Sequence, residues 1–170
     1  EGYRDILEIA RSRMPSSFDF HASKEEPLVP RHRIIEIGAR LSAHGATSQF
    51  PDDVALEDVA EKLKALDVEA AALVLINGYT NPAIEQELAA KISAKSNGLS
   101  VTSAAVIWPE IREYERTLVA CLNAYIQPLM GRYFDGLKAG LARDGVTAPI
   151  LVTASNGGSL SLSSAQERPV

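Results

Sequence analysis

The chain has 170 residues, of which 46% are hydrophobic and 23% charged, with a formal net charge of -5 at pH 7. A chain of this size buries about 70% of the surface that it exposes when unfolded, so one compact core is expected. Its acidic charge gives no attraction to phosphate backbones or anionic lipid, which disfavours nucleic acid and membrane partners. The longest apolar stretch, residues 70–76, is far shorter than the roughly 20 residues of a membrane-spanning helix. With no signal peptide recognised, the sequence predicts a cytoplasmic protein.

Residues 1–32 are predicted to form an irregular segment with a short helix near residues 2–9. Pro15, Pro27 and Pro30 punctuate an extended stretch from residue 12 to residue 31. Residues 33–170 are predicted to form one α/β lobe. Its first element is a strand over residues 33–37, where β-branched residues partly alternate with polar ones, before a loop at residues 45–51.

The clearest pattern begins at Asp52, an N-cap residue placed before apolar residues that recur three and four apart. These are Leu56, Val59, Leu63 and Leu66, and they predict an amphipathic helix. Residues 70–76 are continuously apolar, which is typical of a strand buried on both faces of a parallel sheet. Helix and strand together make half of a βαβ unit.

A second helix is predicted to begin at Asn81 and Pro82, an N-cap and a proline at the first helical position. Its buried face carries Ile84, Leu88 and Ile92, it ends at Asn97-Gly98, and residues 99–106 read as the next strand.

A long helix is predicted from residue 108 to Arg143, ending at Asp144-Gly145. Its buried face is expected to hold Ile111, Tyr114, Leu118, Leu122, Tyr125 and Leu129. Pro128 lies inside this stretch, which predicts a kink, or else two helices with a tight join.

Residues 149–153 predict the last strand, and a final helix is expected to be capped near Ser163, with Gln166 three residues later. Alternating helices and strands with connections of this length predict a mainly parallel sheet with flanking helices.

Single residues that could carry chemistry are few. Cys121 stands alone, with no histidine near it in the sequence, and is better explained as a small buried hydrophobic residue than as a catalytic thiol. His21, His32 and His44 are scattered and lack metal-ligand spacing, so surface positions are expected and no metal site is predicted. No nucleotide-binding glycine motif occurs in these residues.

The densest charge cluster covers residues 110–116. Arg112 and Glu113 lie four and three residues before Arg116, so the three side chains share one helix face. A solvated helix face with weak ion pairs is the favoured interpretation, and ligand contact is the alternative.

Two polar turns follow apolar strands. Ser155, Asn156, Gly157 and Gly158 offer donors and flexible backbone where open α/β sheets often place ligand-contacting turns. A plain tight turn explains this pattern equally well. Residues 77–82 form a second polar turn, which would lie on the same sheet edge if both strands run parallel, although simple strand-to-helix punctuation is favoured.

Six ordered blocks resemble the amino-terminal region of hydantoinase A and 5-oxoprolinase proteins, a superfamily that includes acetone and acetophenone carboxylase subunits. The blocks are residues 2–9, 26–31, 79–82, 109–117, 123–125 and 155–158. They span nearly the whole chain in the same order. The family usually has a tyrosine-aspartate-leucine segment near residues 17–20, and a glycine where Asp67 stands.

The resemblance implies one lobe of an actin-like ATPase fold within a longer parent chain. The parent would use MgATP to activate a cyclic amide for ring opening, or a ketone for carboxylation, because phosphorylating an amide or enolate oxygen makes an unreactive group reactive. The family's phosphate loops would lie upstream of Glu1 and downstream of Val170. Residues 1–170 alone are therefore expected to hold no cofactor and to be inactive.

For the cleft of the parent, the resemblance favours Ser155, Asn156, Gly157 and Gly158 first, then the helix residues Arg112, Glu113 and Arg116, with no acid, base or nucleophile assigned. The implied partners are the remainder of the parent chain and a second, hydantoinase B-like subunit or domain. The leading function is an ATP-dependent hydrolase of hydantoin-like or 5-oxoproline-like rings. An ATP-dependent ketone carboxylase subunit and a non-catalytic scaffold or subunit-interaction module are the alternatives.

Overall fold

The computed structural model describes residues 2–11, 16, 18–23, 26–155 and 157–170. In this part of the chain the helices are α1 (Ile6–Ile9), α2 (Asp53–Ala65), α3 (Pro82–Lys95), α4 (Ala104–Ile107), α5 (Glu113–Arg143) and α6 (Leu162–Glu167), with 3-10 turns η1 (Arg31–Arg33) and η2 (Gly78–Thr80). The strands are β1 (Arg40–Leu41), β2 (Thr47–Gln49), β3 (Ala70–Leu73), β4 (Ser100–Ser103), β5 (Leu151–Thr153) and β6 (Ser159–Ser161). They form two-stranded sheets within a mixed α/β fold.

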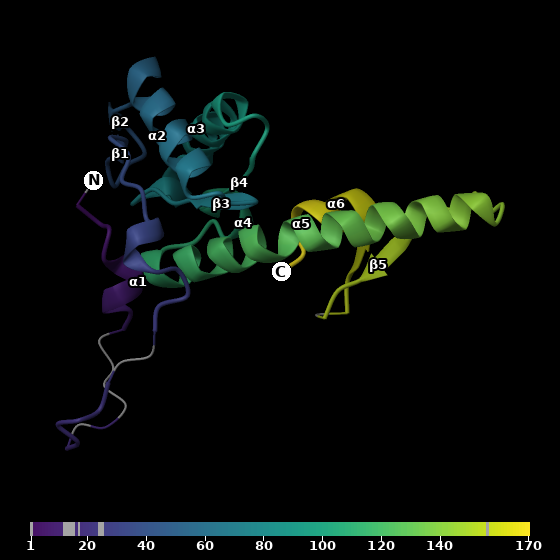
Figure 1. Ribbon diagram of the computed structural model, residues 1–170, viewed down its shortest axis with the longest axis horizontal. Helices are drawn as coiled ribbons and strands as arrows, with labels where there is room; N and C mark the ends of the chain where they lie inside the picture. The colour runs from purple at the N-terminus through teal and green to yellow at the C-terminus, as the bar shows by residue number, and fades with distance from the viewer. Residues whose placement is uncertain (1, 12–15, 17, 24–25, 156) are drawn as a thin grey trace.

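The centre of the fold is the parallel pair β3–β4, joined by α3 as the crossover helix. Helices α2 and α3 lie on one side of this pair and α5 lies on the other (Figure 1). The predicted order of helix, buried strand, helix and strand over residues 52–103 is confirmed. Asp52 caps α2 as predicted, because its carboxylate accepts a hydrogen bond from the amide of Ala55 at 2.9 Å.

Apolar side chains from α2, α3 and the strands form the core. Its buried members are Leu41, Leu56, Val59, Leu73, Leu75, Leu88, Ala89 and Ile92. Each buried leucine stabilises the fold by about 2 kcal/mol relative to an exposed one. The cluster therefore fixes how α2 and α3 lie against β3.

The ends of α3 follow the prediction in part. Pro82 occupies the first helical turn, and the chain leaves the helix through Asn97 and Gly98, both with positive φ. Asn81 is the N-cap residue, as predicted, but its side chain makes no capping hydrogen bond and its amide instead donates to the carbonyl of Gly45 at 3.1 Å. Asn81 therefore attaches the start of α3 to the β1–β2 turn.

The turn between α2 and β3 places Asp67 at φ 48°, a left-handed conformation that favours glycine. We expect Asp67→Gly to raise the free energy of unfolding by about 1 kcal/mol, because a side chain is disfavoured at this φ. Urea titration measures the change. Gly98→Ala is the matched opposite substitution, since Gly98 has φ 78° and nothing within 4 Å of an added Cβ, and it should lower stability. Asp67→Gly without a gain would contradict the expectation.

The predicted strand over residues 99–106 is wrong beyond Ser103, where β4 ends and α4 begins. The amide of Ala105 donates to the carboxylate of Glu85 at 2.7 Å, which turns the chain away from the strand direction. The long helix starts later than predicted, at Glu113, because Arg112 just before it takes φ 85°. It ends at Arg143, in front of Asp144-Gly145, as predicted.

Helix α5 runs without interruption through Pro128, so two helices with a tight join are not formed (Figure 1). Its predicted buried face is wrong. The buried positions are mostly small or polar residues, whereas Leu122, Tyr125 and Leu129 are exposed. Small and polar side chains let α5 lie close to β3 and β4 and reach the polar groups at the strand ends. No helix in the described ranges is long and apolar enough to cross a membrane, and the cytoplasmic location stays a prediction.

Among the described residues the predicted mainly parallel sheet is not formed, because β5 pairs antiparallel with β6 in a separate hairpin. A connection of only five residues is too short for a parallel crossover. The following helix α6 is capped by Ser161 rather than near Ser163, and the Ser161 hydroxyl accepts from the amide of Ser164 at 3.1 Å. Helix α6 packs along the second half of α5, and the β5–β6 hairpin contacts α6 (Figure 1).

The amino-terminal part contains the short helix predicted near residues 2–9, as α1, which contacts α5. The strand predicted over residues 33–37 is wrong. Residues 34–39 form neither helix nor strand, and their apolar side chains Ile35 and Ile37 pack against the core instead. The division at residue 32 stays a prediction.

Candidate functional site

The carboxyl ends of β3 and β4 lie side by side, and the chain beyond β3 forms the 77–81 loop. Asn77 takes φ 60°, and its side-chain amide donates to the carbonyl of Leu41 at 3.2 Å. With Asn81 bound to Gly45, both ends of the loop are attached to the β1–β2 hairpin. Because open α/β sheets bind ligands at the carboxyl ends of parallel strands, this loop is the candidate site.

Beneath the loop lies Glu85 of α3, a carboxylate with no solvent exposure. One oxygen accepts from the amide of Leu75 at 2.9 Å. The other accepts from the amide of Ala105 at 2.7 Å and from the hydroxyl of Ser103 at 2.9 Å. A single side chain thus joins the chain just after β3 to the chain just after β4.

Arg116 of α5 approaches the same point from the other side of the sheet, and it is also fully buried. Its Nη2 donates to the carbonyl of Leu75 at 2.6 Å, so one residue bonds both Glu85 and Arg116 through its peptide groups. Its guanidinium carbon lies 5.7 Å from the ring centroid of Tyr79, within range of a cation–π interaction. Nε and Nη1 have no hydrogen-bond partner among the residues that the structure describes.

Gly78 completes what we name the Glu85–Arg116 cluster, formed by Leu75, Gly78, Glu85, Ser103 and Arg116. A Cβ added to Gly78 would lie 2.3 Å from Oε2 of Glu85 and 3.4 Å from Nη1 of Arg116. The loop therefore rests directly on the two charged side chains, and their positions set the position of its backbone.

Burial raises the pKa of the Glu85 carboxyl above its usual range, because desolvation penalises the charged form. The hydrogen bonds from Ala105, Leu75 and Ser103, and the positive charge of Arg116, act in the opposite direction but are smaller. The cluster holds a carboxyl that loses its proton less readily than one on the surface.

This raised pKa predicts a pH-dependent stability. The folded state binds the Glu85 proton more tightly than the unfolded state, so the contribution of this group is fully present below pH 4.5 and is lost as pH rises through the folded-state pKa. Relative to Glu85→Gln, the free energy of unfolding of the wild type should fall over that range. Urea titrations of both proteins across pH measure the difference.

The comparison with Glu85→Gln removes the contributions of other carboxyls. The lowered pKa values of Asp5 and Glu115 make stability rise with pH, but the wild type and Glu85→Gln both contain these residues. Their contribution therefore cancels in the difference. A stability difference that does not change with pH would show that the folded-state pKa of Glu85 is ordinary.

The charged residues predicted at the start of α5 separate in the structure. Arg112 is exposed and Glu113 is half-buried, so the predicted solvent exposure holds for Arg112. For Arg116 that interpretation is wrong, because this part of the helix faces the strand ends and places the guanidinium in the core. Glu115 makes an ion pair with Arg11.

The residues predicted first for a cleft lie elsewhere. Ser155, Gly157 and Gly158 belong to the exposed turn of the β5–β6 hairpin, where Gly157 has φ 85° and Ala154 donates to the Gly158 carbonyl at 2.8 Å. Asn156 lies outside the described residues. This turn is not on the β3–β4 edge, and the start of α5 is well separated from it (Figure 1). The two predicted sets are therefore not brought together.

Cys121 lies half-buried in α5, and burial raises the pKa of its thiol to about 11. The thiol is therefore neutral at pH 7, which supports its interpretation as a small apolar residue. The three histidines are exposed, as predicted. Among the described residues, no three His, Cys, Asp or Glu side chains are grouped as metal ligands.

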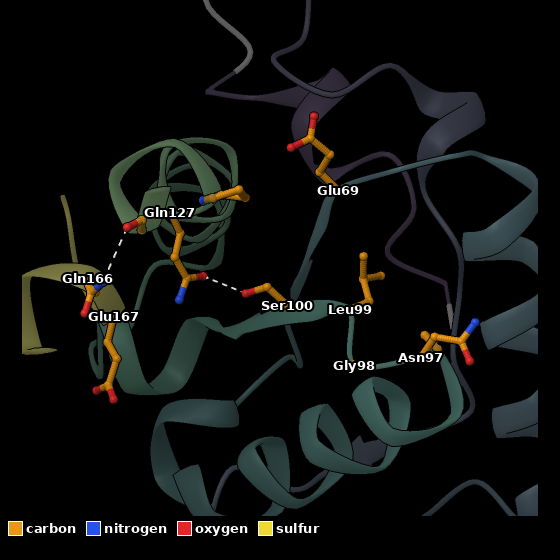
Figure 2. A pocket seen from close by; sticks show the side chains of 11 residues that line it. Glu69, Asn97, Gly98, Leu99, Ser100, Gln127, Gln166 and Glu167 are labelled. Atoms are coloured by element: carbon orange, nitrogen blue, oxygen red, sulfur yellow. Dashed lines mark hydrogen bonds between the residues drawn. The ribbon is translucent and has the colours of Figure 1, made fainter. Parts of the chain in front are cut away.

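A hollow of about 480 Å³ lies at the opposite, amino ends of β3 and β4 (Figure 2). Three of its polar side chains, Ser100, Gln127 and Gln166, bond to one another or to neighbouring groups of α5. Ser100 donates to Gln127 at 2.8 Å, and Gln166 donates to the carbonyl of Gly131 at 3.4 Å. These bonds tie β4 and α6 to α5, so we interpret the hollow as part of the packing.

Glu85 was absent from the residues predicted from sequence. A signal was present, because Glu85 lies three, four and seven residues before Leu88, Ala89 and Ile92, on the apolar face of α3. A charged residue on an apolar stripe predicts a buried polar contact.

Comparison with known proteins identifies the family. The model of the hydantoinase/oxoprolinase N-terminal region matches residues 1–96, and the hydantoinase/oxoprolinase model matches residues 116–170. The chain therefore belongs to the hydantoinase/oxoprolinase family, as the sequence blocks predicted.

Individual relatives agree with this. The alpha subunit of caprolactamase from Pseudomonas jessenii is 31% identical over 93% of the chain, and an uncharacterised protein of Methanocaldococcus jannaschii is 31% identical over 99%. The crystal structure of the ATP-dependent caprolactamase matches with a TM-score of 0.79 over 94% of the chain. A nucleotide-free structure of ATP-dependent acetone carboxylase matches with a TM-score of 0.80 over 99%, at 22% identity.

The chain covers only part of each of these proteins. It spans 23% of the caprolactamase subunit, 25% of the Methanocaldococcus protein and 26% of the acetone carboxylase chain.

Proposed function

We propose that this chain is part of a longer ATP-dependent enzyme that opens a cyclic amide ring. The observation that carries the proposal is the 31% identity to caprolactamase over 93% of the chain. The acetone carboxylase structure, at 22% identity, supports a shared fold alone. The acetophenone carboxylase gamma subunit is 32% identical but over 69% of the chain, so the ketone carboxylase is the alternative. Hydantoin, 5-oxoproline and lactams all contain the cyclic amide that such an enzyme would open.

Within that enzyme we assign this chain a supporting role, as one lobe of an actin-like ATPase fold. The buried Glu85–Arg116 cluster supports this role, since it fixes the 77–81 loop at the carboxyl ends of two parallel strands. Arg116 is fully buried and is therefore a positioning residue rather than a contact for substrate. The described residues contain no group of metal ligands, and we assign no residue of this chain to MgATP.

The experiment is ATP turnover by the full-length parent, with any partner subunit, against caprolactam, hydantoin, 5-oxoproline, and acetone with bicarbonate. We expect a cyclic amide to stimulate turnover in the parent, and residues 1–170 alone to be inactive. Stimulation only by acetone with bicarbonate would favour the carboxylase. Turnover that responds to none of these compounds, with capture of a partner subunit by this piece, would favour the scaffold.

For the substrate cleft of the parent we propose two sets of residues. They are Ser155, Asn156, Gly157 and Gly158, and Arg112 and Glu113, which would line one cleft only when the rest of the parent is present. Asn156→Ala and Arg112→Ala in the parent test this. We expect a rise in KM or a fall in kcat. Unchanged turnover and KM in both variants would reject the assignment.

A further inference from the structure

Strand β3 has one unpaired edge and an unusual sequence for an edge strand. It pairs with β4 alone among the described residues. Residues 70–76 contain no charge and no proline, the features by which natural edge strands avoid further pairing. A continuously apolar run is typical of a strand with a neighbour on each side and both faces covered.

A groove of about 1200 Å³ runs along this strand. Every residue from Glu69 to Asn77 lines it, and so do residues 34–37 and 39–41. The groove is larger than the roughly 300–1,000 Å³ of ordinary small-molecule pockets. Its length along a strand fits an extended peptide better than a compact ligand.

The remaining walls of the groove are mostly apolar. Val59, Leu63 and Leu66 come from α2 and the turn after it, while Cys121, Tyr125 and Leu129 come from α5. Tyr125 is 83% and Leu129 61% exposed, and both were predicted from sequence to be buried. Apolar side chains that are exposed around an open strand edge indicate a surface that another segment covers.

We propose that an apolar β-strand of the parent chain, from outside residues 1–170, lies in this groove and pairs with the free edge of β3. Backbone hydrogen bonds would hold it, as in strand addition to an exposed sheet edge. Most of the parent is available to supply it, because this chain spans only 23% to 26% of the three relatives compared above. Since the groove has apolar walls on both sides, the strand should be continuously apolar, as in the interior of a parallel sheet.

The proposal rests on the chain being part of a longer protein and not on the choice of substrate. Amide hydrogen exchange in the full-length parent, resolved residue by residue across β3, tests it without any activity measurement. The internal reference is β2, whose residues are all exposed. The amide of Leu75 is excluded, because Glu85 protects it in either case.

We expect every amide from Ala70 to Leu73 to exchange at least about tenfold more slowly than those of β2, because both edges of β3 are paired. Alternate β3 amides that exchange as fast as β2 would show an unpaired edge and overturn the proposal. A dilution series completes the test. Protection that disappears on dilution would assign the groove to a second copy of the protein, and protection that persists supports a strand of the same chain.

Discussion

Arg116→Ala is expected to lower the free energy of unfolding by about 3 kcal/mol, because it removes a fully buried side chain and leaves a buried carbonyl without its donor. The substitution leaves the carbonyl of Leu75 without its 2.6 Å donor and leaves Glu85 without its positive neighbour. It also empties a fully buried volume at the start of α5. Urea titration at neutral pH measures the loss.

Arg112→Ala is the matched control for this change. It removes the same charge four residues earlier on the same helix start, from an exposed side chain. Its effect should stay within about 0.5 kcal/mol, as for most surface substitutions. If the two variants are equally stable, the guanidinium of Arg116 does not hold the strand ends together.

Gly78→Ala is expected to lower the free energy of unfolding by about 2 kcal/mol, within the range for overpacked sites. The new methyl group would lie 2.3 Å from Oε2 of Glu85. This carboxylate cannot move away freely, because it accepts three hydrogen bonds from the ends of β3 and β4. The 77–81 loop must therefore shift, or the carboxylate must lose its partners.

Gly136→Ala is the matched control, because it adds the same methyl group but is expected to raise stability. Gly136 lies inside α5 with nothing within 4 Å of an added Cβ, so alanine should stabilise the helix by about 0.5–1 kcal/mol. Thermal or urea unfolding distinguishes the two variants. A neutral Gly78→Ala would mean that the loop does not rest on Glu85.

The helices could be predicted from sequence because local signals define them. The Asp52 cap, Pro82 and the Asn97-Gly98 end give α2 and α3 close to their observed bounds. The wrong predictions concern features that depend on contacts between residues far apart in the sequence. The end of β4 depends on the bond from Ala105 to Glu85, and the buried face of α5 depends on its close approach to polar strand ends.

The sheet was misjudged for a related reason. The sequence of β3 is that of a central strand, yet among the described residues it pairs only with β4. Residues 149–153 have a strand composition, but the tight turn at Gly157 makes a hairpin and not a parallel partner. Pattern and composition identify a strand without identifying its neighbour.

The candidate site was only partly predictable. Arg116 was named, but as part of a solvated or ligand-contacting face, because spacing along one helix cannot show a contact with α3. Glu85 was missed, since the same periodicity that defined α3 drew attention to its apolar residues. What brings the two together is the parallel pairing of β3 with β4, which places both strand ends at Leu75 and Ser103.

The most direct measurement is the coupling between ATP hydrolysis and ring opening in the full-length parent. Phosphate and the ring-opened product are quantified together with caprolactam, hydantoin or 5-oxoproline as substrate. If the parent is an ATP-dependent cyclic-amide hydrolase, the two products appear together and both require ATP. Ring opening without ATP, or phosphate release that depends only on acetone and bicarbonate, would contradict this function.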